Sequence, residues 1–134
     1  MSNSSDNDGT GDAGKRILVI DDDELVRETI CNFLLASGYQ VESAEDGDQG
    51  LRLLEANPPD LVVTDILMPG KEGMETIMEI RRGGSDVKIV AISGQNWHKD
   101  ISYLDLAKQL GADATLPKPF SRTELLTVIE ELLS

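Results

Sequence analysis

Four short apolar segments of this 134-residue chain each lead into side chains that can do chemistry. Those side chains are Asp21, Asp22, Asp65, Ser93 and Lys118. Carboxylates are hard oxygen ligands, and without His or Cys among them they favour magnesium or manganese over zinc. A carboxylate that faces such a metal can attack phosphorus and form an acyl phosphate. A hydroxyl and a lysine can then hold the phosphoryl oxygens, so the set is typical of phosphoryl transfer onto an aspartate.

Each of these residues alone also has a plainer structural interpretation. Asp23 is suited to cap a helix, which would leave Asp21 and Asp22 in a solvated turn. Asp65 precedes a Pro-Gly turn and Ser93 precedes a glycine, and both patterns are common in ordinary turns. A lysine before a proline is usually a surface residue. The site interpretation is favoured because four features coincide at four strand ends, where open parallel sheets bind their ligands.

Strands and helices alternate strictly along the chain after residue 14. Strands are predicted over residues 17–20, 39–44, 61–64, 88–92 and 113–116. Helical spacing of apolar residues predicts helices over residues 26–34, 49–56, 74–81, 101–110 and 122–132. Such alternation predicts an α/β fold, a doubly wound parallel sheet with right-handed crossovers and helices on both faces. Ser121 and Glu124 have the spacing of a capping box before the last helix.

Composition and charge exclude several classes of function. Asp and Glu number 25 against 12 Lys and Arg, a net charge of −13, which argues against binding nucleic acid or anionic membranes. Apolar runs of at most four residues predict neither a transmembrane helix nor a signal peptide. The single cysteine, Cys31, cannot form an internal disulfide and fits a reducing, cytoplasmic compartment.

The chain divides into two parts by composition. Residues 1–14 lack large apolar side chains after Met1, so we expect a disordered acidic tail. Residues 15–134 form the expected domain, and we expect no output domain after it.

Four segments of the chain together resemble a receiver domain of two-component response regulators, of the single-domain, CheY-like kind. They are Ile17–Asp23, Pro59–Gly70, Ile89–Gly94 and Gly111–Phe120. The resemblance covers Lys15 to Leu133. It implies a flavodoxin-like fold, a five-stranded parallel sheet in the order 2-1-3-4-5 with five helices.

The resemblance also implies roles for the candidate residues. Asp65 would be the phosphoacceptor, and Mg²⁺ would be held by Asp21, Asp22, Asp65 and the backbone carbonyl of Leu67. Ser93 would donate a hydrogen bond to the phosphoryl group.

Lys118 would pair with the same phosphoryl group, and the Lys118–Pro119 bond is often cis in this family. The phosphoryl donor would be a phosphohistidine on a sensor histidine kinase or a histidine phosphotransfer protein. The output would be a downstream protein target, so we expect a signalling module and not an enzyme.

Two positions depart from the family pattern. Thr115 stands where Tyr or Phe is common, which leads to the hypothesis that output runs through the loop Gln95–Asp100 and the helix after it. Trp97, His98 and Tyr103 cluster there. Leu67 is apolar where a polar side chain could orient a hydrolytic water, which predicts comparatively slow loss of the phosphoryl group.

Two alternatives remain open at this stage. In a phosphatase of haloacid-dehalogenase type, Asp21 would attack phosphorus and Asp23 would serve as acid and base. That interpretation leaves Asp65 without a role and finds Leu25 where Thr or Val is usual. The other alternative is a pseudo-receiver that binds partners independently of phosphate. Cys31 is expected to be a buried or half-buried thiol with no neighbour that would lower its pKa.

Overall fold

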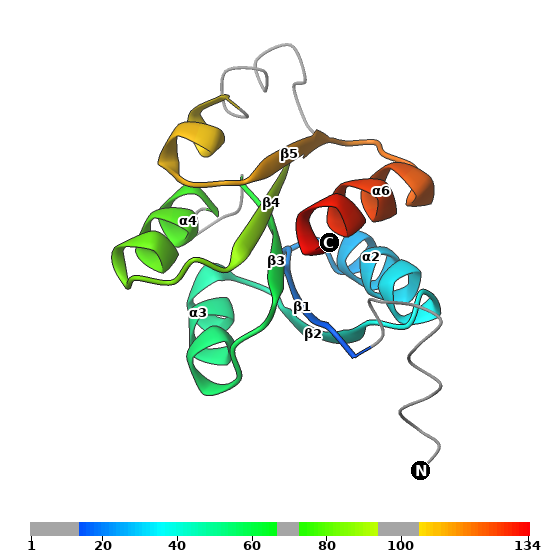
Figure 1. Ribbon diagram of the computed structural model, residues 1–134, viewed down its shortest axis with the longest axis horizontal. Helices are drawn as coiled ribbons and strands as arrows, with labels where there is room; N and C mark the ends of the chain where they lie inside the picture. Colours follow the sequence, from blue (N-terminus) through cyan, green and yellow to red (C-terminus); the bar gives the residue numbers. More distant parts are fainter. Residues whose placement is uncertain (1–13, 67–72, 94–104) are drawn as a thin grey trace.

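A computed structural model describes residues 14–66, 73–93 and 105–134 of the chain. Five parallel strands form one sheet in the order β2-β1-β3-β4-β5, as Figure 1 shows. The strands are β1 (Arg16–Ile20), β2 (Gln40–Ala44), β3 (Leu61–Asp65), β4 (Lys88–Ser93) and β5 (Ala114–Pro117). This order confirms the predicted doubly wound, flavodoxin-like arrangement.

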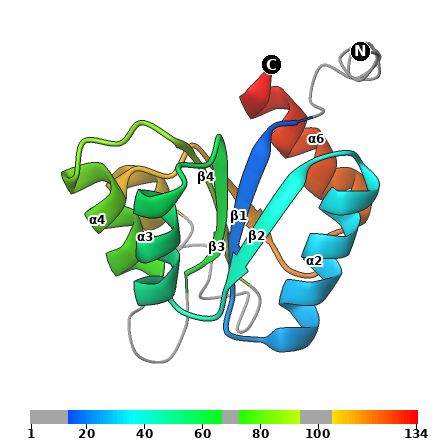
Figure 2. The same ribbon diagram turned by 90° about the horizontal axis from the view of Figure 1, so that it is seen from below.

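Helices cover both faces of the sheet. They are α2 (Glu24–Ala36), α3 (Gly47–Ala56), α4 (Gly73–Arg82), a helical segment over residues 105–110, and α6 (Arg122–Leu133). Figures 1 and 2 place α2 and α6 on one face and α3 and α4 on the other. None of the helices in the described ranges is long and apolar enough to span a membrane.

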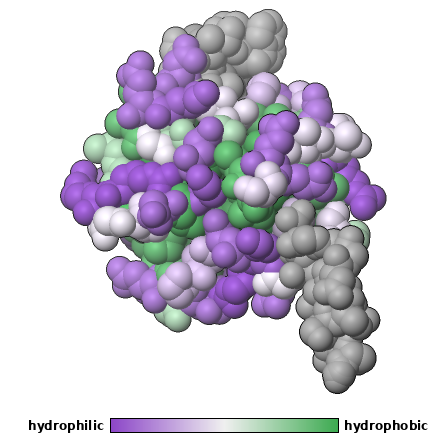
Figure 3. Space-filling view, viewed as in Figure 1, coloured by the Kyte–Doolittle hydropathy of each residue, from purple (hydrophilic) through white to green (hydrophobic). Residues whose placement is uncertain are grey.

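Each face of the sheet has its own apolar core. Ile17 and Val19 pack on the α2 and α6 side, whereas Leu18 and Ile20 pack on the α3 and α4 side. This alternation follows from the period-2 geometry of a strand, and it explains why β1 is apolar without interruption. Apart from Asp21 and Asp65, the charged residues of the described ranges are not buried. The face in Figure 3 is largely hydrophilic, with apolar residues showing between the hydrophilic ones.

Side-chain caps fix the starts of three helices. Asp23 accepts a hydrogen bond from the Val26 amide at the start of α2, and Asp46 does the same for Gln49 in α3. The capping box predicted before α6 is confirmed, with Ser121 and Glu124 each accepting a hydrogen bond from the other's amide. These caps satisfy amide groups that a helix leaves unpaired at its first turn.

The boundaries differ from the sequence prediction by one to a few residues. The helix α3 begins at Gly47, two residues earlier than predicted, because Asp46 supplies its cap. The strand β4 continues through Ser93, and β5 is shifted by one residue to end at Pro117. A proline is tolerated there because β5 lies at the edge of the sheet.

Arg81 at the end of α4 joins the amino ends of β4 and β5. Its guanidinium donates to the carbonyl oxygens of Gly111, at 3.0 and 2.8 Å, and of Val87, at 2.7 Å. It also pairs with Asp113 at 2.9 Å. The Arg81 side chain is half-buried.

We predict that Arg81→Ala lowers the free energy of unfolding by roughly 2–3 kcal/mol, because several partly buried acceptors lose their donor at once. Arg82→Ala is the matched control, since Arg82 is the next residue of the same helix and is exposed. The free energies of unfolding of the two variants and the wild type are compared by chemical denaturation. Equal, small losses for the two variants would show that the Arg81 contacts contribute nothing to stability.

Candidate metal centre

The strand register brings the predicted site residues to one edge of the sheet. Ile20 of β1 lies beside Thr64 of β3, so Asp21, which follows β1, and Asp65, the last residue of β3, lie at the same level. On the other side of β3, Ser93 is the last residue of β4. It pairs with Pro117, and Lys118 follows. This edge holds the carboxyl ends of the strands, where α/β sheets bind ligands.

Three carboxylates converge at this edge. Oxygen atoms of Asp21, Asp22 and Asp65 all lie within 4.8 Å of one another. Asp21 is 0% exposed and Asp65 is 6% exposed, whereas Asp22 is exposed to solvent. The plainer interpretation of a solvated turn is therefore wrong for Asp21, although Asp23 does cap α2 as that interpretation requires.

Lys118 supplies the positive charge between two of these carboxylates. Its Nζ lies 3.2 Å from Asp21 Oδ2 and 3.1 Å from Asp65 Oδ2, and its side chain is only 19% exposed. The Lys118 amide donates to the Ser93 carbonyl at 2.7 Å, which ties the lysine to the end of β4. The Lys118–Pro119 peptide bond is cis, as expected. Lys118 is thus a member of the site and not a surface lysine.

Burial and charge shift the proton affinities at this site. Burial raises the pKa of Asp21, and the neighbouring Asp65 raises it further; hydrogen bonds from the Asp23 amide and Lys118 oppose the rise without cancelling it. Burial alone would lower the pKa of Lys118, but the negative charges of Asp65 and Asp21 outweigh it and raise that pKa. The lysine therefore remains protonated, and the ionised form of Asp21 is destabilised by its surroundings.

The donor set fits a magnesium ion. Three carboxylates within reach of one point offer the hard oxygen ligands that Mg²⁺ prefers, and the exposed Asp22 leaves one side open to water. An additional cation would also relieve the repulsion that a single lysine must otherwise balance. Leu67, whose backbone carbonyl was expected to complete the set, lies outside the described residues.

Ser93 contributes a hydroxyl that points to no partner among the described residues. The residue is 1% exposed, and its Oγ makes no hydrogen bond within those residues. A buried hydroxyl without a partner is costly, so this one is suited to donate to a ligand at the same edge. The backbone hydrogen bond from the Lys118 amide to the Ser93 carbonyl places these two residues side by side at this edge.

Arg27 is a residue near the site that sequence reasoning missed. Its Nη1 donates to the backbone carbonyl of Asp21 at 2.8 Å. The only signal in the sequence is its position four residues after the cap Asp23, one helical turn into α2. That spacing places Arg27 above the turn but does not reveal its backbone partner.

Two other expectations concern Thr115 and Cys31. Thr115 is half-buried in β5 and pairs with Ala91, while the loop Gln95–Asp100, Trp97, His98 and Tyr103 lie outside the described residues. Burial raises the pKa of Cys31, although Ser43 and Arg27 act to lower it. The expectation that no neighbour acts to lower the pKa of Cys31 was therefore wrong.

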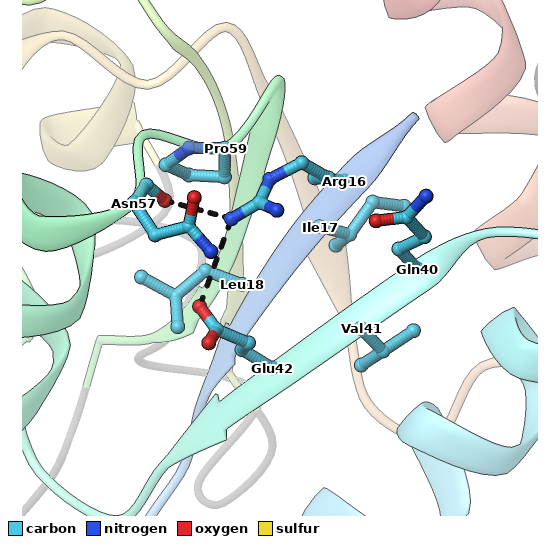
Figure 4. A pocket seen from close by; sticks show the side chains of 8 residues that line it. All are labelled: Arg16, Ile17, Leu18, Gln40, Val41, Glu42, Asn57 and Pro59. Atoms are coloured by element: carbon cyan, nitrogen blue, oxygen red, sulfur yellow. Dashed lines mark hydrogen bonds and ion pairs between the residues drawn. The ribbon is translucent and has the colours of Figure 1, made fainter. Parts of the chain in front are cut away.

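A polar cavity of about 220 Å³ lies at the opposite end of β1 and β2. Figure 4 shows Arg16 in its wall, with Nη2 3.1 Å from the Asn57 carbonyl oxygen and 4.0 Å from Glu42 Oε1. Pro59 and Gln40 also line the cavity. The cavity shares no lining residue with the acidic cluster, and we assign it no role in the chemistry of that cluster.

Known proteins provide an independent comparison. The family model of the response regulator receiver domain matches residues 17–130. Response regulator MprA from Mycobacterium sp. (strain KMS) is 41% identical over 118 residues, which cover 88% of this chain and 50% of that protein. The chain thus spans about half the length of the curated relatives it matches.

Solved structures are similar over nearly the whole chain. The receiver domain of NtrX from Brucella abortus superposes with a TM-score of 0.82 at 30% identity, covering 87% of this chain and 97% of that one. A CheY-like receiver domain protein from Methanospirillum hungatei JF-1 gives a TM-score of 0.81 at 30% identity, with coverages of 90% and 94%.

We predict that Asp21→Asn stabilises the metal-free protein at pH 7 by about 1 kcal/mol, the scale of ordinary single-residue effects. Because the pKa of Asp21 is raised in the folded state, the contribution of Asp21 to stability is fully present below about pH 3.8, the ordinary pKa of an aspartate. That contribution is lost as the pH rises through the folded-state pKa. The gain from Asn therefore shrinks at low pH.

The measurement is denaturant unfolding in the presence of a chelator, at neutral and acidic pH. Asp86→Asn removes the same charge at an exposed position away from the site and serves as the control. If Asp21→Asn were destabilising at pH 7 while the control was neutral, the charge of Asp21 would be favourable and our electrostatic interpretation would be wrong.

Proposed function

This chain belongs to the response-regulator receiver family, and on that premise we propose that Asp65 accepts a phosphoryl group from a phosphohistidine donor. The observation that carries the proposal is the position of Asp65. Its carboxylate lies within 4.8 Å of the carboxylates of Asp21 and Asp22 and 3.1 Å from the ammonium group of Lys118. A nucleophilic carboxylate, a cation site and a lysine are the parts that such a transfer requires.

The proposed step is a single displacement at phosphorus. An Asp65 oxygen forms the new O–P bond while the N–P bond of the phosphohistidine breaks. The electrons of that bond go to the imidazole nitrogen, and the ring leaves neutral because its second nitrogen carries a proton. No further reactant is needed, and the product is an acyl phosphate on Asp65.

Magnesium would be held by the carboxylates of Asp21, Asp22 and Asp65, with the Leu67 carbonyl as the family resemblance implies. When bound, the ion neutralises charge on the carboxylates and on the transferring group. Asp65 could not attack a phosphoryl group from within an unbalanced cluster of negative charges, so we propose that the reaction depends on Mg²⁺.

Lys118 and Ser93 would hold the transferred group. The lysine already lies between Asp21 and Asp65, so a phosphoryl oxygen on Asp65 offers its ammonium group a new partner at short range. The Ser93 hydroxyl, buried and without a partner in the described residues, can donate to another oxygen. Both contacts favour the phosphorylated state and draw the ends of β4 and β5 toward Asp65.

We propose that this movement changes a partner-binding surface and that the chain is a signalling module, not an enzyme with turnover. The donor would be a sensor histidine kinase or a histidine phosphotransfer protein, and the output would be a downstream protein. A cytoplasmic location is proposed from the single cysteine and the acidic composition of the sequence. With Thr115 in place of an aromatic residue, the movement does not depend on a ring in β5.

We predict that acetyl phosphate labels the wild-type chain once, in the presence of Mg²⁺ and not in its absence. Intact-mass spectrometry measures the added phosphoryl group. Asp65→Asn should remain unlabelled because its amide is not a nucleophile toward phosphorus. Asp86→Asn, which has the same charge change at an exposed position, should be labelled like the wild type.

The same variants separate this proposal from the phosphatase alternative. A phosphatase that used Asp21 and Asp23 would hydrolyse phosphate esters with Asp65→Asn as well as with the wild type. Sustained hydrolysis by Asp65→Asn would contradict the proposed function. A pseudo-receiver would be indicated if the wild type took no label at saturating Mg²⁺.

A further inference from the structure

Arg27 lies where it can control the turn that carries two of the three carboxylates. It belongs to the first turn of α2 and is half-buried. Its guanidinium donates to the backbone carbonyl oxygen of Asp21, at 2.8 Å. The arginine thus holds the main chain of the turn at the point where the first metal-ligand candidate leaves β1.

The other contacts of the turn hold its two ends. The Asp21 amide donates to the Ala44 carbonyl at 3.1 Å, which joins the turn to the end of β2. The Asp23 amide donates to Asp21 Oδ1 at 2.9 Å, and the Asp23 side chain caps α2. The peptide that links Asp21 to Asp22 lies between these anchors, and its carbonyl is the group that Arg27 holds.

The hydrogen bond from Arg27 constrains more than the carbonyl oxygen of Asp21 itself. Because the peptide unit is planar, the position of the Asp21 oxygen determines the plane that contains the Cα atom of Asp22. The orientation of the exposed Asp22 side chain therefore depends on a hydrogen bond made to the backbone. Without that bond, the Asp22 carboxylate can turn away from Asp21 and Asp65.

Because Arg27 binds a backbone carbonyl and not a carboxylate, the carboxylate oxygens stay available to a metal ion. An arginine bound to the carboxylates themselves would compete with a metal ion for their oxygens. Arg27 reaches the turn from the side of a polar hollow of about 190 Å³, which it lines together with Ser43, Glu45 and Gln49. The guanidinium therefore approaches the turn from this hollow and is not bound to the carboxylates.

We propose that Arg27 is a positioning residue for the metal ligands, which sets Mg²⁺ affinity by orienting the Asp21–Asp22 peptide. This inference rests on the proposed function, because it assumes that the carboxylate cluster binds Mg²⁺. Outer contacts that orient metal ligands typically change metal affinity by about 10–100-fold when they are removed. We expect a loss near the lower end of that range for Arg27→Ala.

The sign of the change in Mg²⁺ affinity distinguishes a positioning role of Arg27 from a purely electrostatic one. Removing a positive charge near a cation site should strengthen Mg²⁺ binding by Coulomb's law. Removing an orienting hydrogen bond should weaken it. Arg52→Ala is the matched control, since Arg52 is an exposed arginine on α3 and its loss changes the net charge equally.

Calorimetric titration of the purified chain with MgCl₂ makes the test. We expect Arg27→Ala to bind Mg²⁺ about tenfold more weakly than the wild type, Arg27→Lys to regain most of the affinity through its remaining donor, and Arg52→Ala to match the wild type. Saturating Mg²⁺ should restore acetyl phosphate labelling of Arg27→Ala. Arg27→Lys keeps the test informative if the alanine variant does not fold.

Two outcomes overturn the inference, and they are distinguishable. If the wild type binds Mg²⁺ and the Arg27 variants bind it equally well or more tightly, Arg27 has at most a structural role. Lower thermal stability with an unchanged Mg²⁺ affinity would lead to the same conclusion. If the wild type itself binds no Mg²⁺, the metal dependence of the proposed function fails together with this inference.

Discussion

Like charges held together at one edge of the sheet are the constraint on which the rest of this structure depends. Asp21 is buried, Asp65 nearly so, and both share the single ammonium group of Lys118 at 3.2 and 3.1 Å. Burial and mutual repulsion make the ionised cluster unfavourable, and the raised pKa of Asp21 expresses that cost. Under the proposed function, a metal ion would supply the missing positive charge as the negatively charged phosphoryl group is transferred.

The two apolar cores hold this cluster in place. Parallel register alone sets Asp21 beside Asp65, since Ile20 pairs with Thr64 and both strands are buried on each face. The amino edge of the sheet has the opposite character. There the guanidinium of Arg81 is matched by Asp113 and by backbone carbonyls, so its charge is neutralised. The unbalanced charge of the carboxylate cluster and the neutralised charge of Arg81 therefore lie at opposite ends of the same strands.

The sequence alone predicted the architecture and most of the site, for physical reasons. Runs such as Ile17–Ile20 are apolar throughout because both faces of a doubly wound sheet are covered, and residues after such runs must meet at one edge. The different burial of Asp21 and Asp22 could not be predicted, because it depends on the turn between them. Arg27 and Arg81 were missed as contact residues for a similar reason. The partner of Arg27 is a backbone carbonyl, and Arg81 donates to backbone carbonyls as well as to Asp113. Backbone carbonyls have no sequence signature and acquire their positions only when the chain is folded.

The most direct test of this account is the stability of the wild-type chain as a function of Mg²⁺ concentration. A ligand that binds only the folded state raises the free energy of unfolding by RT ln(1 + [L]/Kd). If the carboxylates of Asp21, Asp22 and Asp65 form a cation site, that free energy rises with the logarithm of MgCl₂ at constant ionic strength, and Asp65→Asn shows a smaller rise. A free energy of unfolding that is independent of Mg²⁺, or an equal rise in wild type and Asp65→Asn, would contradict the account.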